Sequence, residues 1–155
     1  MAKKLILGIG NLLMKDDGIG IHVVRRLNEM ELPDGIEAID GATFTLDLLP
    51  FFQEAEKILI VDAVKGDKSP GAIYYLTPHN LIHEEERILS LHQIGFLDVI
   101  ETAEKLGYCA ETRILGIEPS DISWGMELSD TLQKEFDRII DAVIECMNQF
   151  LISKG

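Results

Sequence analysis

Three aspartates and one histidine are the side chains whose types and positions favour chemistry in this sequence. Asp16 and Asp17 follow a glycine-containing turn, Asp62 comes directly after the apolar run 59–61, and His92 lies just before an expected helix. Two carboxylates and one imidazole suit a divalent ion such as nickel or zinc, with coordination positions left open. We therefore expect Asp17, Asp62 and His92 to form a metal-binding cluster. The three are far apart in the sequence, so spacing alone does not prove the site.

Each of these residues also has a purely structural interpretation. A carboxylate such as Asp62 at the rim of a core is costly unless it is paired or bound to a cation, so a helix cap or a salt bridge would also explain it. Asp16 and Asp17 suit a helix N-terminus through capping and the helix dipole, although one of the two suffices for that purpose. A single histidine such as His92 is usually a surface residue or a residue with satisfied hydrogen bonds.

The glycines before the aspartate pair do not fit a nucleotide-binding loop. Gly8 and Gly10 match the first two glycines of a GxGxxG motif, but Leu13 occupies the position of the third. A pyrophosphate at this helix N-terminus would be repelled by the charges of Asp16 and Asp17. The stretch therefore favours a cation over a phosphate.

A serine or cysteine nucleophile and an HExxH metal site are disfavoured by the residue pattern. No Ser-His-Asp or Cys-His arrangement is evident in the sequence, and the segment 83–87, HEEER, contains only one histidine and is not an HExxH motif. Cys109 and Cys146 share no short spacing. This spacing is typical of free thiols in a reducing compartment and not of a disulfide framework or a CxxC metal site.

The composition favours one acidic domain that spans residues 1–155. Of the 155 residues 46% are hydrophobic, and 14 basic and 27 acidic residues give a formal net charge of −13. This charge opposes binding to nucleic acid and permits a cation or a basic partner, but an acidic solvent-facing surface is the simpler explanation. No apolar run approaches the roughly 20 residues of a membrane helix, and residues 1–4 lead into no signal-peptide cleavage site. We expect a cytoplasmic protein without membrane insertion, and a monomer as its simplest state.

Strands alternate with helices in the hydrophobic pattern, which predicts a three-layer α/β/α sandwich around a mostly parallel five-stranded sheet. The expected strands are residues 4–9, 36–39, 57–64, 72–76 and 112–117, and the expected helices are residues 19–30, 43–52, 93–106 and 129–153. The connection 65–71 is too short for a crossover helix, so one strand is expected to run antiparallel. Pro50 is expected to kink or shorten its helix. We interpret residues 77–90 as a loop with room for one helical turn.

Four stretches in consistent order resemble one protein family. They are GIGNLLMKDDGIG at residues 8–20, LIVDAV at 59–64, LHQIGFLDVI at 91–100 and LGIEP at 115–119, followed by a loop and a final amphipathic helix. Together they resemble the hydrogenase maturation endopeptidases, which process the large subunit of nickel-iron hydrogenases. The resemblance covers nearly the whole chain and implies the same sandwich fold with a twisted sheet.

The resemblance implies a selective endopeptidase that removes the C-terminal extension of a hydrogenase large-subunit precursor after nickel insertion. It places the family's metal-contacting residues at Asp17, Asp62 and His92, and the preceding acidic position at Asp16. Some members have Glu where this chain has Asp17. The turn 41–43 also matches the family and is expected to line the cleft. Nickel held by the precursor is the implied metal, for which zinc or cadmium would substitute in vitro.

The chemistry of cleavage is left open by the sequence. Either the metal lowers the pKa of a bound water, or a carboxylate of Asp16 or Asp17 acts as the general base in an aspartyl-type reaction. Asp16 could equally be a cap or an orienting residue. Two other functions remain as alternatives: a non-catalytic nickel or zinc chaperone of hydrogenase maturation, and a metallopeptidase of broad specificity.

Overall fold

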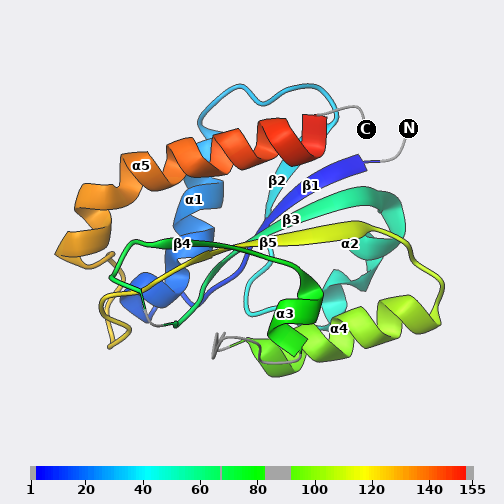
Figure 1. Ribbon diagram of the computed structural model, residues 1–155, viewed down its shortest axis with the longest axis horizontal. Coiled ribbons are helices and arrows are strands. Elements are labelled where there is room, and N and C mark those ends of the chain that lie inside the picture. Colours follow the sequence, from blue (N-terminus) through cyan, green and yellow to red (C-terminus); the bar gives the residue numbers. More distant parts are fainter. Residues whose placement is uncertain (1–2, 67, 83–91, 153–155) are drawn as a thin grey trace.

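A five-stranded sheet forms the centre of the molecule, as the computed structural model shows (Figure 1). The structure describes residues 3–66, 68–82 and 92–152. The strands are β1 (Lys3–Gly8), β2 (Ile36–Asp40), β3 (Ala55–Ala63), β4 (Ile73–Leu76) and β5 (Glu111–Ile117). They lie in the order β2-β1-β3-β5-β4, and every neighbouring pair is parallel except β4 with β5. The mostly parallel sheet and its one antiparallel strand are therefore confirmed.

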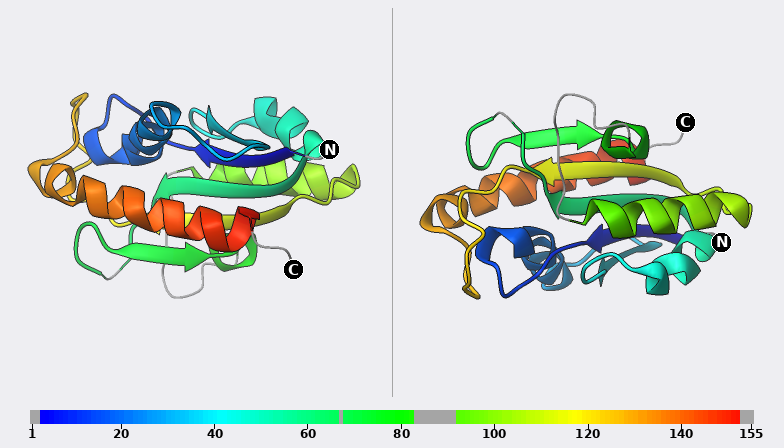
Figure 2. Two further views of the ribbon diagram at one scale, coloured as in Figure 1. Left: turned by 90° about the horizontal axis from the view of Figure 1, so that it is seen from above. Right: turned by 90° about the horizontal axis from the view of Figure 1, so that it is seen from below.

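Helices cover both faces of the sheet and make three layers (Figures 1 and 2). One face packs against α1 (Ile19–Asn28) and α5 (Asp130–Cys146), which continues as the π-helical η4 (Met147–Ile152). The other face packs against α2 (Leu49–Glu54) and α4 (Gln93–Lys105), with the short α3 (Pro78–Ile82) beside α4. Two further short helices are η1 (Lys15–Gly18) and η2 (Leu46–Leu48). The sandwich architecture predicted from the sequence is confirmed.

Side chains of the central strand β3 alternate strictly between the two cores. Ile58 and Ile60 belong to the core under α2 and α4, whereas Leu59 and Val61 belong to the core under α1 and α5. Successive side chains of a strand point to opposite faces. Asp62 shares the parity of Ile58 and Ile60, so its carboxylate lies on the α4 side of the sheet.

The helix expected at residues 43–52 differs from the structure. Pro50 does not kink a helix, because it lies in the first turn of α2, where no backbone N–H is needed. The single helix expected at residues 43–52 is instead the pair η2 and α2. The helical turn expected within residues 77–90 corresponds to α3, and residues 83–90 lie outside the described part of the chain. Gly107 ends α4 as expected, with a φ of 78°.

Close backbone approach explains the glycines of the opening motif. A Cβ at Gly20 would collide with the carbonyl oxygens of Val61 and Ile9, and a Cβ at Gly8 would collide with the carbonyl of Gly20. Only glycines permit the start of α1 to rest directly on the ends of β1 and β3. This contact brings the residues before α1 to the end of β3, where Asp62 lies.

No helix in the described ranges is long and apolar enough to cross a membrane.

Candidate functional site

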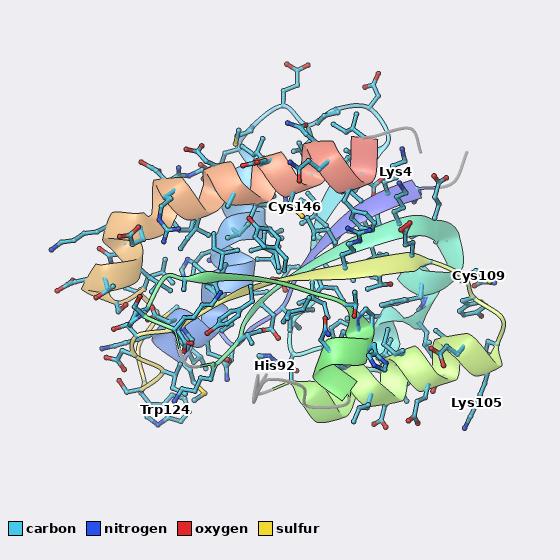
Figure 3. The ribbon with its side chains drawn as sticks, in the orientation of Figure 1. Lys4, His92, Lys105, Cys109, Trp124 and Cys146 are labelled. Carbon is cyan, nitrogen blue, oxygen red and sulfur yellow. The ribbon has the colours of Figure 1, made fainter. Side chains whose placement is uncertain are left out.

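Asp17, Asp62 and His92 come together at the carboxyl edge of the sheet. Asp17 lies on η1 and Asp62 near the end of β3. His92 lies at the N-cap of α4 (Figure 3). His92 Nε2 is 3.4 Å from Asp17 Oδ2, and His92 Nδ1 is 3.1 Å from Asp62 Oδ1. All three side chains are buried: Asp17 and Asp62 are 1% and 4% exposed, and the side chain of His92 is 8% exposed. The imidazole therefore bridges the two carboxylates.

The loop between β1 and η1 holds Asp17 by its backbone. Asn11 donates its backbone N–H to Asp17 Oδ2 at 3.1 Å, and Asp17 donates its own N–H to the carbonyl of Met14 at 3.0 Å. A Cβ at Gly10 would collide with the carbonyl of Asp17, so the loop closes this tightly only with glycine there. The glycine-containing turn thus positions the carboxylate that follows it in the sequence.

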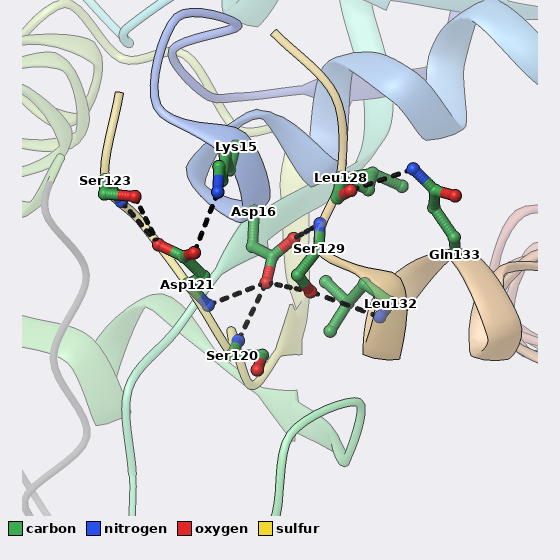
Figure 4. Close-up of polar contacts among 9 residues, drawn as sticks. All are labelled: Lys15, Asp16, Ser120, Asp121, Ser123, Leu128, Ser129, Leu132 and Gln133. Carbon is green, nitrogen blue, oxygen red and sulfur yellow. Dashed lines mark hydrogen bonds and ion pairs between the residues drawn. The ribbon is translucent and has the colours of Figure 1, made fainter. Parts of the chain in front are cut away.

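Asp16 makes its hydrogen bonds to a different part of the molecule (Figure 4). Its Oδ2 accepts hydrogen bonds from the backbone N–H groups of Ser120 and Asp121, both at 2.9 Å, and from Ser129 Oγ at 2.7 Å. Its Oδ1 accepts the backbone N–H of Ser129 at 2.8 Å. Ser129 is also the N-cap of α5 and accepts the N–H of Leu132. Asp16 therefore braces the β5–α5 loop and the start of α5.

The neighbouring aspartates thus have separate partners. Of the four catalytic candidates, Asp17, Asp62 and His92 contact one another. The side chain of Asp16 instead forms its hydrogen bonds with residues 120–129. Both carboxylate oxygens of Asp16 are occupied by donors and its side chain is fully buried. Of the roles of cap, orienting residue and general base, this geometry supports the orienting one for Asp16.

The turn after β2 forms a further part of the site's surroundings. The carbonyl of Ala42 accepts the N–H of Gly10 at 2.9 Å, and the buried Phe44 packs against Phe96 of α4 with ring centroids 5.0 Å apart. A Cβ at Gly95 would collide with the carbonyl of Phe44, so α4 begins directly against this turn. The turn therefore fixes the start of α4, where His92 lies.

Backbone strain is concentrated in the two segments that follow β1 and β2. Three described residues other than glycine have left-handed φ angles: Lys15 at 42°, Ala42 at 49° and Phe44 at 65°. Such conformations cost about 1–3 kcal/mol each and persist only where surrounding contacts impose them. Lys15 lies between β1 and α1, and the other two lie directly after β2, in segments that lead to the site; such a distribution is typical of functional sites.

Glu118 is a buried carboxylate that the sequence motifs did not identify as a candidate. It is 5% exposed, and its Oε1 accepts hydrogen bonds from Tyr74 Oη at 2.6 Å and from the N–H of Gly66 at 2.8 Å. It therefore ties the segment after β3 to the edge strand β4. The signal that identified Asp62, a carboxylate at the end of an apolar strand, also applies to Glu118.

The electrostatics of the cluster favour a charged imidazole. Burial lowers the pKa of His92, but its hydrogen bonds with Asp17 and Asp62 and the charges of both carboxylates outweigh burial and raise the pKa to about 10. At neutral pH the cluster then consists of one imidazolium between two carboxylates. The positive charge of His92 compensates the burial of the two aspartates.

The donor set fits a divalent cation in type but is not assembled as a finished metal site. Two carboxylates and one imidazole are suitable ligands, and Asp17 Oδ1 is buried with no hydrogen-bond partner among the described residues. Within those same residues no three His, Cys, Asp or Glu side chains already converge on one point suitable for a metal. A cation must therefore displace the proton that His92 shares with the carboxylates.

The titration of His92 tests this electrostatic arrangement. We expect NMR to give a pKa near 10 in the folded protein against the ordinary histidine value of 6.5. Because the folded pKa is the higher one, protonated His92 stabilises the fold fully below about pH 6.5, and this stabilisation is lost as the pH rises through about 10. A native His92 that titrates near 6.5 would contradict the imidazolium bridge.

Comparison with known proteins identifies relatives of this chain. The family model described as hydrogenase maturation protease matches residues 21–146. The hydrogenase expression/formation protein HupD of Rhodobacter capsulatus is 37% identical over 146 residues, which cover 91% of this chain and 70% of HupD. The hydrogenase 2 maturation protease of Escherichia coli is 26% identical over 148 residues, which cover 94% of this chain and 90% of that protein.

Solved structures agree with these sequence relatives. The hydrogenase maturating endopeptidase HybD from Escherichia coli superposes with a TM-score of 0.83 at 26% identity, over 95% of this chain and 93% of HybD. The nickel-iron hydrogenase maturation protease HybD from Thermococcus kodakarensis superposes with a TM-score of 0.74 at 30% identity, over 92% of this chain and 97% of that one. The resemblance noted in the sequence is therefore confirmed, and the chain belongs to the hydrogenase maturation protease family, whose members are endopeptidases.

Proposed function

We propose that this endopeptidase removes the C-terminal extension of a nickel-iron hydrogenase large-subunit precursor, and that it uses nickel already held by the precursor as its recognition element. The observation that carries the proposal is the buried bridge of Asp17, His92 and Asp62 at the carboxyl edge of the sheet. Ligands of open α/β sheets bind outside this edge. The bridge offers the oxygen and nitrogen donors that a divalent ion requires.

The protonated state of His92 explains why the metal would come with the substrate. An ion that binds the free protein has to displace a proton whose pKa is about 10 and break two hydrogen bonds. Nickel that is already held by thiolates of the precursor needs only the remaining positions of its coordination sphere. The precursor would then dock in register only after nickel insertion, which makes metal loading the condition for cleavage.

The two oxygens that His92 bridges now are the atoms nickel would contact. Asp17 Oδ2 and Asp62 Oδ1 face the two ring nitrogens. Loss of one imidazolium proton would leave a neutral ring, and its freed nitrogen and the two carboxylate oxygens would be available to a cation. Asp17 Oδ1 has no described hydrogen-bond partner and is left to accept a proton from water. The water oxygen attacks the scissile carbonyl carbon, the C–N bond breaks, and the proton passes to the leaving amine.

The same geometry is less suited to a free-standing metal chaperone. A chaperone that holds nickel or zinc tightly needs ligands that converge in the unloaded protein, and the described residues contain no such converged group. A metallopeptidase of broad specificity would also carry its own metal. The proposed protease needs only a site that becomes complete with the substrate's ion.

Cleavage of nickel-loaded and nickel-free precursor by the purified protein tests the proposal. We expect the loaded precursor to be shortened and the nickel-free precursor to remain intact, with mass spectrometry locating a single cut. Reconstitution of the nickel-free precursor with zinc or cadmium shows whether another divalent ion satisfies the site. Equal cleavage of loaded and metal-free precursor would overturn nickel recognition, and cleavage of generic peptides would favour a broad metallopeptidase.

A further inference from the structure

Two loops beside the site carry large apolar side chains in solvent. Leu13 is 50% exposed, Trp124 is 77% exposed and Met126 is 67% exposed. Leu13 belongs to the β1–η1 loop, and the other two belong to the β5–α5 loop. Exposed apolar side chains that gather in one place are typical of interaction surfaces. We call these three residues the apolar tip.

Backbone hydrogen bonds join the two loops of the apolar tip. The N–H of Gly125 donates to the carbonyl of Leu13 at 2.9 Å, and the N–H of Lys15 donates to the carbonyl of Gly125 at 2.8 Å, which makes a short parallel bridge. Lys15 Nζ also pairs with Asp121 Oδ2 at 3.0 Å. With the Asp16 brace, these contacts hold both loops in one arrangement. The exposure of the tip is therefore built into the fold, and binding would cost little ordering entropy.

The apolar tip is linked to the candidate active site through the β1–η1 loop. Leu13 lies in the loop whose Asn11 donates its N–H to Asp17 Oδ2, so the loop that carries one tip residue also holds a site carboxylate in place. A hollow of about 390 Å³ adjoins the tip, and Lys15, Met126 and Gln133 are among the residues that line it. A protein bound at the tip would cover the surface next to Asp17.

We propose that the apolar tip is the docking surface for the folded body of the hydrogenase precursor, with Trp124 as its anchor; this rests on the proposed function. Figure 3 shows Trp124 projecting outward from its loop. Protruding side chains fit a concave apolar recess on a folded partner, whereas an extended peptide tail is usually bound in a groove or along a strand edge. Buried tryptophans dominate the energetics of many such interfaces.

Substitution of the tip tests the proposal through substrate affinity. We expect Trp124→Ser combined with Met126→Ser to raise KM for nickel-loaded precursor at least about tenfold with little change in kcat, because the cleavage residues are untouched. Leu106→Ser is the matched control, since Leu106 is also an exposed apolar residue, at 56%, but lies beyond the far end of α4. Unchanged urea unfolding of the double variant shows that the loops still fold.

The tryptophan also reports docking directly. Trp124 is the one tryptophan of the sequence, so protein labelled with 5-fluorotryptophan gives one ¹⁹F resonance. We expect this resonance to shift when unlabelled precursor is added. A double variant with unchanged KM, or a ¹⁹F resonance that stays in place when precursor is bound, would overturn the docking surface.

Failure of the docking surface and failure of the proposed function give different results. Wild-type protein that binds the precursor through the tip but fails to cleave it would refute the proposed function and support the docking surface. Wild-type protein that sediments as a dimer, and becomes monomeric in the double variant, would show that a second copy of this chain occupies the tip and would overturn the docking surface.

Discussion

Asp62→Asn is expected to lower kcat/KM for the nickel-loaded precursor at least about 100-fold, the lower range for loss of a group that acts directly in proton transfer or charge stabilisation. Asp62 is 4% exposed, and its Oδ1 lies 3.1 Å from His92 Nδ1. Asparagine keeps the shape of the side chain but removes the charge that a cation would meet. The substitution also removes one of the two carboxylates that raise the pKa of His92.

Two measurements on this variant separate chemistry from folding. Precursor cleavage gives the loss of activity, and NMR titration of His92 should show its pKa moving down towards 6.5. Asp98→Asn is the control, because Asp98 is an exposed carboxylate on the same helix that His92 caps. Cleavage at the wild-type rate by the Asp62→Asn protein would exclude Asp62 from the site.

Asp16→Asn is expected to destabilise the fold by about 3 kcal/mol or more, the effect of disrupting several charge-assisted hydrogen bonds in a buried place. Both oxygens of Asp16 accept hydrogen bonds from the chain, four in all, with Ser120, Asp121 and Ser129 as donors. An asparagine must turn its amide NH₂ towards one of these donor groups, so no rotamer satisfies the network. We therefore expect substitution of Asp16 to lower the free energy of unfolding more than substitution of Asp17 does.

Urea unfolding and precursor cleavage together test this assignment of Asp16. Ser129→Ala provides a graded control, since it removes the α5 N-cap hydroxyl and one donor to Asp16 and should cost about 1 kcal/mol. If Asp16 acts by holding residues 120–129 in place, the Asp16→Asn protein should lose much of its stability. Its activity should fall as well, because Asp17 would be displaced. A fully stable Asp16→Asn protein without activity would instead show that Asp16 is the general base.

Local patterns in the sequence were sufficient for the positions of the strands along the chain and for the position of Asp62. The apolar run of β3 and the parity of its residues place Asp62 at the edge of the sheet on the side of α4. The pairing of β4 with β5 could be predicted only in part from the sequence. The short connection 65–71 required an antiparallel strand, but it did not specify β5 as the partner, because strand order depends on packing across the whole sheet.

The separate roles of Asp16 and Asp17 could not be predicted from the sequence. The two residues are adjacent on η1, and both are charged and buried. Their difference arises from contacts with residues more than 70 positions away: residues 120–129 for Asp16 and His92 for Asp17. The strained turn after β2 was also hidden, since Ala42 and Phe44 adopt left-handed angles that usually favour glycine.

The Asp16 brace also governs when the site can exist during synthesis. Its hydrogen bonds join residues that are 104 to 113 positions apart in the chain. Asp17 is made early by the ribosome, but the donors that fix its neighbour are made only when residues 120–129 emerge. The nascent chain therefore holds its acidic residues without a finished site for most of translation. The contacts that close the start of α5 onto the loop after β1 therefore require synthesis as far as residues 120–129.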